Sequence, residues 1–163
     1  MTAMAVMMVL LCACGGSDFA PPVPKGSSET EVHTGDEALP DSEEYYYDLE
    51  NVVLYLETYG ELPLNYITKN EARKRGWEGG SVEDYIPDAA IGGDHYGNYE
   101  EKLPGGKNVT YHECDLDTHG YKNRGKRRLI YSDDGKYYYT RDHYETFKEV
   151  LVNGTKVTLG DEL

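Results

Sequence analysis

The chain has 163 residues, with 30 acidic side chains against 16 basic ones and a formal net charge of −14. This length predicts one domain of roughly 100–150 residues with some chain left over. No apolar run approaches the roughly 20 residues of a membrane-spanning helix, so we expect no span, and the acidity argues at first against a nucleic-acid partner.

The N-terminus predicts an export signal. Residues 3–11 form an apolar run as long as the hydrophobic region of a signal peptide. The following Leu11–Gly16 resembles a bacterial lipobox, in which Cys14 is the better candidate for lipid attachment because the preceding Ala13 is small. We expect a signal peptide with a lipobox over 1–14, with an ordinary cleaved signal as the alternative. Either way, the protein is expected outside the cell, secreted or lipid-anchored on the outer face of a bacterial membrane.

Residues 15–45 are rich in Pro, Ser, Gly and acids. Such a segment cannot bury enough apolar surface to offset its ordering entropy, so we expect an acidic disordered tether. Half of the net charge lies in residues 1–47, which carry one basic and eight acidic side chains. One hypothesis is that the acidic segment Glu29–Glu44 folds back onto a basic face, and the alternative is a solvated tether.

Two helices are predicted at the start of the folded part. Residues 49–56 carry apolar side chains at i, i+3, i+4 and i+7, with Asp48 before this stripe and Gly60 after it. A second helix is expected to open at Thr68, with a capping-box glutamate three residues later, and to stop at Gly76.

The second half of the chain predicts a sheet. After a possible short helix over 81–86 the helical period disappears, and 132–135 is a hairpin turn signal. Helices followed by strands predict an α+β domain with N-terminal helices packed on a five-stranded antiparallel sheet. The expected strands are Ala90–Tyr96, Thr110–Asp115, Arg128–Ser132, Lys136–Thr140 and Thr146–Val152.

The C-terminal extension over 151–163 has its own turn signal. Asn153 and Gly154 lie between β-rich stretches of Val150–Leu159. We expect an extra hairpin that extends the last strand.

Several motifs at matched spacing then point to one family. The chain resembles the barnase-like microbial guanyl-preferring ribonucleases from about Tyr46 to Val150, which implies a ribonuclease domain over 46–150. The stretch Arg124–Ile130 looks more like the streptomycete branch of that family. The motifs are Leu62–Lys69, Gly76–Trp77, Ile91–Asp94, Lys102–Gly105 and Asp142–Phe147.

The resemblance implies the catalytic roles. Glu113 matches the general base that takes the 2′-hydroxyl proton, and His143 matches the general acid for the departing 5′-oxygen. Arg124 and Arg128 match two phosphate-clamping arginines, and Lys69 matches a lysine that stabilises the transition state. A lysine in the first turn of a helix is otherwise ordinary surface charge.

The same resemblance implies how the base is chosen. Glu100 takes the position of the carboxylate that reads guanine, and the backbone of Asn98 and Tyr99 belongs to the same loop. Tyr99 stands where the family has arginine, so we expect guanine preference with weaker electrostatic help. Tyr96 and Tyr144 are plausible stacking platforms.

Two acidic residues are expected to support these groups. Asp115 would orient the two arginines by ion pairing, and Asp94, from the Ile91–Asp94 motif, would help to hold the site.

Other patterns have plainer explanations. Cys114 alternates with Glu113 along a strand, so we expect a small buried thiol facing the helices rather than a nucleophile. The spacing of His112, Cys114 and His119 fits no zinc pattern, and 115–126 lacks the last ligand of a calcium loop. We therefore expect no metal site and no cofactor.

The leading hypothesis is a monomeric, metal-independent endoribonuclease that cleaves single-stranded RNA 3′ of guanine through a 2′,3′-cyclic phosphate. The alternative is a non-catalytic surface module that binds RNA or protein on the same fold. Five basic residues in the seven positions 122–128 show that the acidity does not exclude RNA. A small acidic barstar-like inhibitor is a possible partner, and membrane contact is expected only through the lipid anchor.

Overall fold

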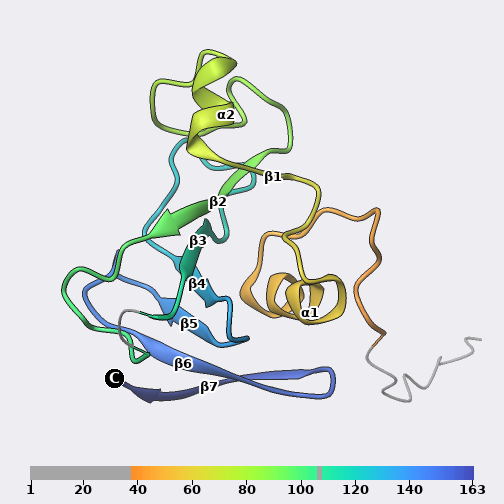
Figure 1. Cartoon of the computed structure of the whole chain (residues 1–163). Coiled ribbons are helices and arrows are strands. Elements are labelled where there is room, and N and C mark those ends of the chain that lie inside the picture. The colour runs from red at the N-terminus through yellow and green to blue at the C-terminus, as the bar shows by residue number, and fades with distance from the viewer. Residues whose placement is uncertain (1–37, 106–107) are drawn as a thin grey trace, which may run out of the picture. The chain divides into compact units, whose positions relative to one another are not determined.

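The computed structural model describes residues 38–105 and 108–163 (Figure 1). The predicted leader with Cys14 and most of the predicted tether lie outside the described residues. Within the described residues, no helix is long and apolar enough to cross a membrane. The elements are α1 (Leu49–Tyr59), β1 (Tyr66–Ile67), α2 (Lys69–Lys74), β2 (Ala90–Tyr96), β3 (Tyr111–Asp115), β4 (Arg128–Ser132), β5 (Tyr137–Thr140), β6 (Lys148–Asn153) and β7 (Lys156–Glu162).

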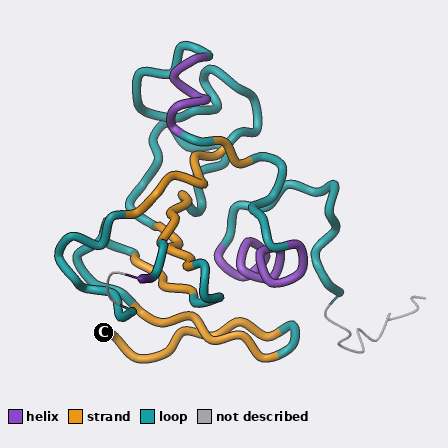
Figure 2. The backbone as a smooth tube through the Cα atoms, viewed as in Figure 1, coloured by secondary structure: helices purple, strands orange, loops and turns teal. Residues whose placement is uncertain are grey.

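The sheet has seven strands in the order β1 to β7, rather than the five predicted (Figure 2). The five predicted strands are β2–β6, an antiparallel series close to the expected bounds. β1 was missed because it is only two residues long, and it pairs with β2 in parallel. A two-residue strand carries no alternating pattern that the sequence could reveal.

α1 forms where its pattern predicts. The Asp48 carboxylate accepts a hydrogen bond from Asn51 N at 3.0 Å, and Gly60 ends the helix at φ 73° with its N–H bonded to the Leu56 carbonyl at 2.8 Å. Val52 and Val53 are fully buried against one face of the sheet, in a core cluster that includes residues of β3, β4, β5 and β6. This packing leaves the opposite face of β3 for a site.

α2 begins with the predicted capping box between Thr68 and Glu71 but ends at Lys74. The helix predicted over 81–86 is absent, because the N–H groups of Tyr85 and Ile86 both bond to the Val82 carbonyl in a turn, at 3.0 and 2.9 Å. α2 and this turn pack around a small second core that contains Trp77.

The predicted tether ends earlier than expected. Residues 38–45 lie against α1, where the Tyr59 hydroxyl donates to the Pro40 carbonyl at 2.9 Å and the Tyr55 hydroxyl donates to the Ser42 carbonyl at 3.1 Å. Pro40 is buried. These eight residues therefore belong to the folded part.

The predicted C-terminal hairpin is confirmed. β6 and β7 pair in antiparallel fashion around the turn at Asn153 and Gly154, with Gly154 at φ 64°. Val152 and Val157 pack against the core under α1. The extension is thus part of the domain rather than a loose tail.

Candidate active site

A cavity of about 580 Å³ lies on the face of the sheet away from α1. Alternation along β3 decides which side chains face it, because Cys114 packs under α1 while Glu113 points the other way, as predicted. Burial raises the pKa of the Cys114 thiol well above its usual value, as expected for a structural thiol. The lining residues are Lys69, His95–Glu100, Lys102, Glu113, Arg124 and His143–Glu145.

Glu113 lies at the floor of the cavity and is only 7% exposed. Lys69 Nζ donates to one carboxylate oxygen of Glu113, and the Tyr144 hydroxyl donates to the other at 2.5 Å. Three of the predicted residues therefore meet directly. An ionised carboxylate offers about four lone-pair sites, so Glu113 keeps the capacity to accept a further proton donor.

A β-bulge positions Lys69 beside Glu113. Gly93, at φ 87°, is the extra residue in β2, so that Asp94 rather than Gly93 pairs with Glu113 across the sheet. The Asp94 carboxylate accepts from the backbone N–H of Lys69 at 2.8 Å and so fixes the first turn of α2. Asp94, which the sequence analysis expects to support the site, thus contacts the backbone of Lys69.

His143 and Tyr144 have an unusual backbone conformation. Their φ angles are 67° and 74°, in the left-handed region that costs about 1–3 kcal/mol for a residue with a side chain. His143 N donates to the Lys126 carbonyl at 3.1 Å, and Tyr144 N donates to Thr140 Oγ1 at 3.0 Å. The surrounding contacts hold this turn and aim both side chains into the cavity.

Asp142 organises the same turn, and the sequence analysis did not assign it a role. Its carboxylate accepts from Thr146 N at 3.0 Å, from Thr146 Oγ1 at 2.7 Å and from Thr140 Oγ1 at 2.9 Å. These hydrogen bonds hold the pKa of Asp142 well below its usual value. The aspartate–threonine spacing within the Asp142–Phe147 motif is the signal that could have indicated this role.

The surroundings of His143 favour its neutral form. Burial is the largest cause that lowers the pKa of His143, followed by the charges of Arg128 and Arg124, while Glu113 opposes the shift. The protonated His143 ring is therefore a stronger acid than the imidazolium of free histidine, and a smaller fraction of His143 is protonated near neutral pH.

Asp115 joins the two arginines, as predicted. Arg124 donates to its carboxylate from Nε at 2.5 Å and from Nη2 at 2.8 Å, and Arg128 Nε lies 2.8 Å from Oδ1. Burial raises the pKa of the Asp115 carboxyl, and the two guanidinium groups oppose that shift. Arg124 lines the cavity, and its guanidinium lies 5.5 Å from the centre of the Trp77 ring.

Arg128 occupies a different position from Arg124. Its side chain is 2% exposed and does not line the cavity. Nη1 donates to the Arg127 carbonyl at 2.7 Å and to the Arg124 carbonyl at 3.2 Å, and Nη2 donates to the Gly125 carbonyl at 3.2 Å. The structure therefore brings the two predicted clamps to different depths, with Arg128 beneath the loop that carries Arg124.

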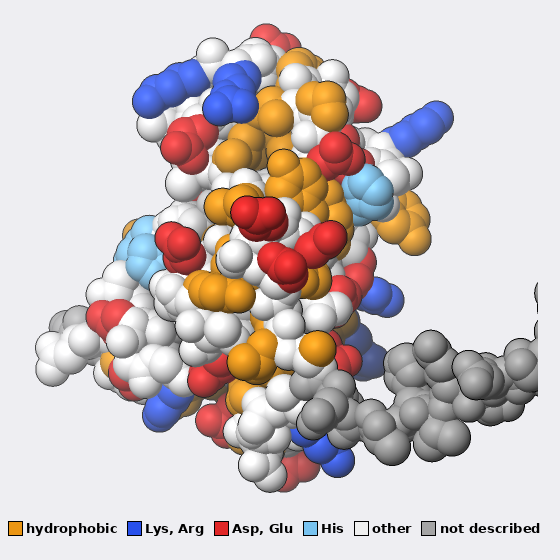
Figure 3. Space-filling view, turned by 90° about the vertical axis from the view of Figure 1, so that its right-hand side faces the viewer, with side chains coloured by type: hydrophobic (Ala, Val, Ile, Leu, Met, Phe, Trp, Pro, Cys, Tyr) orange, Lys and Arg blue, Asp and Glu red, His pale blue; other side chains and the backbone are white. Residues whose placement is uncertain are grey.

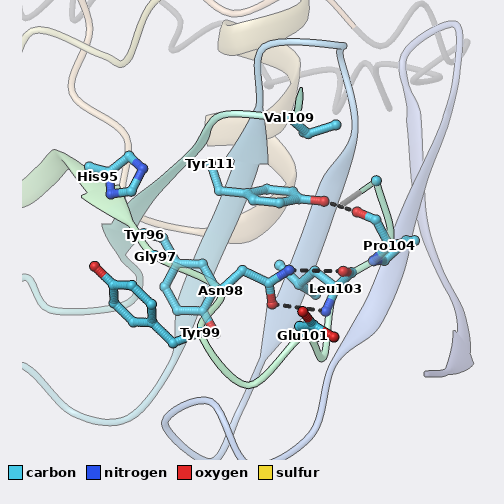
Figure 4. A pocket seen from close by; sticks show the side chains of 11 residues that line it. His95, Tyr96, Gly97, Asn98, Tyr99, Glu101, Leu103, Pro104, Val109 and Tyr111 are labelled. Atoms are coloured by element: carbon cyan, nitrogen blue, oxygen red, sulfur yellow. Dashed lines mark hydrogen bonds between the residues drawn. The ribbon is translucent and has the colours of Figure 1, made fainter. Parts of the chain in front are cut away.

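Hydrogen bonds within the predicted recognition loop hold its conformation (Figure 4). The Asn98 side chain accepts from Leu103 N at 3.0 Å and donates to the Leu103 carbonyl at 2.9 Å. Asn98 and Glu101 both have positive φ, at 42° and 52°. The Asn98 amide is thus used within the loop, which leaves backbone groups to face a ligand.

Glu100 extends from this loop with 74% of its side chain exposed and pairs with Lys102 at 2.8 Å. Lys102 Nζ also donates to the Tyr144 carbonyl at 2.8 Å. Lys102, which the sequence analysis placed only within a motif, therefore links the recognition loop to the turn that carries His143.

Aromatic rings form one wall of the site. Tyr96 stacks on Tyr144 with ring centres 5.4 Å apart, and Tyr144 contacts the His143 ring at 4.6 Å. Tyr99 is 93% exposed. A second cavity of about 580 Å³ shares Tyr96 and Tyr99 with the first and extends toward Val109, but Glu113, Arg124 and His143 line only the first (Figure 4).

Charge is unevenly distributed over the surface. The face with α1 shows acidic side chains among apolar ones, with Lys and Arg gathered over α2 and at the rim (Figure 3). The cavity brings Lys69, Lys102 and Arg124 together with Glu100, Glu113 and Glu145. An acidic chain can therefore present several cationic groups to an anionic ligand at one place, each close to a carboxylate.

Comparisons with known proteins place the chain among ribonucleases. A ribonuclease family model matches residues 50–151, a range that includes all residues lining the cavity. A ribonuclease from Heyndrickxia coagulans is 39% identical over 104 residues, which cover 62% of this chain and 94% of that protein. For a ribonuclease from Bacillus intermedius the identity is also 39% over 104 residues, with 62% and 63% covered. The guanyl-specific ribonuclease St of Saccharopolyspora erythraea is 41% identical over 76 residues, covering 47% of this chain and 71% of that protein.

Proposed function

The chain belongs to the barnase-like microbial ribonuclease family, and from this premise we propose that it is an endoribonuclease that cleaves single-stranded RNA 3′ of guanine. The observation that carries the proposal is that Lys69, Glu113, Arg124 and His143, from four separate segments, line one cavity. These groups supply a base, an acid and cations, which RNA cleavage by the 2′-hydroxyl requires.

Glu113 is the general base. It takes the proton of the 2′-hydroxyl as that oxygen attacks the adjacent phosphorus and forms a 2′,3′-cyclic phosphate. When Glu113 becomes neutral, it releases Lys69 from its ion pair. The ammonium group is then available to the phosphoryl oxygens at the moment when their charge increases.

His143 is the general acid. The bond between phosphorus and the 5′-oxygen breaks, and His143 gives its proton to that oxygen. The bound phosphate raises the pKa of the imidazole, which offsets the lowering by burial and by the two arginines. Slow hydrolysis of the cyclic phosphate uses the same two groups with their roles exchanged.

The arginines divide the electrostatic work. Arg124 presents its guanidinium to the phosphoryl oxygens from the cavity wall while Asp115 holds its orientation. Arg128 keeps the 124–127 backbone in place and adds its positive charge from below.

Glu100 reads the base. Guanine N1 and N2 both donate hydrogen bonds, and the Glu100 carboxylate accepts them after leaving Lys102. An exposed ion pair of this kind is weak, so the exchange is easily made. Backbone N–H groups of Asn98 and Tyr99 complete the contact, Tyr96 and Tyr144 support a stacked base, and the similarity to a guanyl-specific ribonuclease supports this choice.

The proposal extends to the cellular setting. The apolar run and lipobox at residues 3–16 support export, with Cys14 as the lipidated end. An exported ribonuclease endangers its producer before export, which supports a small acidic inhibitor as a partner. We take the acting unit as one chain, since a single chain supplies every catalytic group named above.

The test compares turnover with affinity on the purified chain in the presence of a chelator. RNA with guanosine should be cleaved, and His143→Ala and Glu113→Gln should each lose at least a hundredfold in kcat. Lys69→Ala should also lose activity, whereas Lys122→Ala, a matched exposed lysine outside the cavity, should retain it. RNA binding without turnover in the unmodified chain would instead favour a non-catalytic module.

A further inference from the structure

A second cluster of reactive side chains lies outside the cavity. Glu83, Asp88 and His119 each offer a ligand atom, and these atoms lie within 4.8 Å of one another. Glu83 and Asp88 belong to the segment between α2 and β2, and His119 belongs to the loop after β3. These two segments lie side by side (Figure 1), and Ser81 N donates to the Lys122 carbonyl between them at 3.2 Å.

The structure already holds these groups in place. His119 Nδ1 lies 2.6 Å from Glu83 Oε1, and the other oxygen of Glu83 accepts from Gly120 N at 2.8 Å. The Tyr47 ring stacks on the His119 ring at 4.7 Å, and its hydroxyl donates to the Asp88 carbonyl at 2.7 Å. Tyr47 therefore fixes the plane of the imidazole and the backbone of Asp88 together.

The donor set is one that divalent transition metals accept. One imidazole and two carboxylates are ligands typical of Zn²⁺, whose bonds to them are about 2.0–2.2 Å long. Tetrahedral geometry with such bonds places the ligand atoms about 3.3 Å apart. Asp88 and His119 are exposed, so small side-chain movements suffice to reach this spacing.

The local field also favours a cation. The carboxylates of Glu83 and Asp88 lie around one imidazole in a chain of net charge −14.

We infer that Glu83, Asp88 and His119 form a binding site for one divalent transition-metal ion of the zinc class, with water completing its coordination. The ion joins the segment before β2 to the loop after β3, which continues to Arg124. The ion stabilises these two segments outside the active-site cavity and takes no part in the cleavage. The inference does not depend on the proposed reaction.

The experiment titrates Zn²⁺ into the EDTA-treated and dialysed full chain, with calorimetry and thermal unfolding as readouts. We expect one ion per chain and, at about a hundredfold excess over Kd, a rise in Tm of about 5–10 °C. His119→Gln and Glu83→Gln should each lose the ion and the rise in Tm, while a cooperative unfolding transition in EDTA shows that both variants are folded. Tyr47→Phe, which keeps the ring, should retain binding.

His143→Ala serves as the control, because a catalytic histidine is a second place where zinc could bind. This variant should keep the same stoichiometry and the same rise in Tm. Three results would overturn the inference: no change in Tm with Zn²⁺, a change that survives in His119→Gln, or a change lost in His143→Ala. An equal response to Mg²⁺ would contradict the assignment to the zinc class.

Discussion

The depths of Arg124 and Arg128 predict that alanine substitutions at the two positions have opposite signatures. Arg128→Ala removes a buried guanidinium that bonds three carbonyls and pairs with the buried Asp115. Breaking a buried ion pair from one side costs about 3–5 kcal/mol, because the remaining charge stays buried and less fully compensated. For a domain of this size we expect the Tm to fall by about 10–20 °C.

Arg124→Ala removes a guanidinium that is 22% exposed and lines the cavity. Water compensates part of the lost pair with Asp115, so we expect a loss of only about 1–2 kcal/mol in stability. The loss in kcat should be at least a hundredfold, since this group faces the developing phosphoryl charge.

Thermal unfolding and single-turnover cleavage, measured on both variants below their Tm, compare the two effects. Arg127→Ala is the matched control, because its side chain is 58% exposed and pairs with Asp117 on the surface. In this control variant, both the Tm and the rate of cleavage should stay close to those of the unmodified chain. The reasoning would be refuted if Arg128→Ala kept its Tm and lost as much kcat as Arg124→Ala, since Arg128 would then act on the substrate rather than on the loop.

Three further predictions concern proton transfer, base choice and packing. Burial lowers the pKa of His143 below the usual histidine value of about 6.5, and the general acid must be protonated to act. We therefore expect kcat/KM for a guanylyl dinucleotide to fall tenfold per pH unit once the pH exceeds this lowered pKa. A pH profile that stays flat to about pH 8 would contradict this. Glu100→Gln should lose about 10- to 100-fold in kcat/KM for cleavage after guanosine and little after adenosine, which competition between two oligonucleotides measures; equal losses for both bases would exclude Glu100 as the reader. Thr118→Val should stabilise the chain by about 1 kcal/mol in denaturant unfolding, because Thr118 Oγ1 is buried and has no hydrogen-bond partner among the described residues. A loss of stability would show that the hydroxyl is satisfied.

The parts of the fold that follow from local rules were predictable from sequence. Asp48 and Thr68 cap the two helices as expected, and alternation places Glu113 and Cys114 on opposite faces of β3. β1 was not predictable, because two residues paired in parallel depend on where a distant strand passes. The turn over 81–86 resembles a helix in composition, but the N–H groups of Tyr85 and Ile86 share the Val82 carbonyl and form a turn instead of a continuing helix.

The candidate site was likewise predictable from sequence only in part. The resemblance identified residue types at matched positions, and the structure brings Lys69, Glu113 and Tyr144 into contact. Spacing could not reveal that Arg128 lies beneath its loop, because depth depends on how the 124–127 backbone folds over it. It also could not reveal that His119 meets Glu83, because a loop before β2 and a loop after β3 supply the two side chains.

The most direct test of the account is the chemistry of the product ends. A short RNA with one internal guanosine is incubated with the purified chain in EDTA, and the fragments are analysed by mass spectrometry over time. We predict one cut 3′ of the guanosine, a 2′,3′-cyclic phosphate that later becomes a 3′-phosphate, and no product with His143→Ala. Fragments that carry a 5′-phosphate, or cleavage that requires a metal ion, would contradict the account.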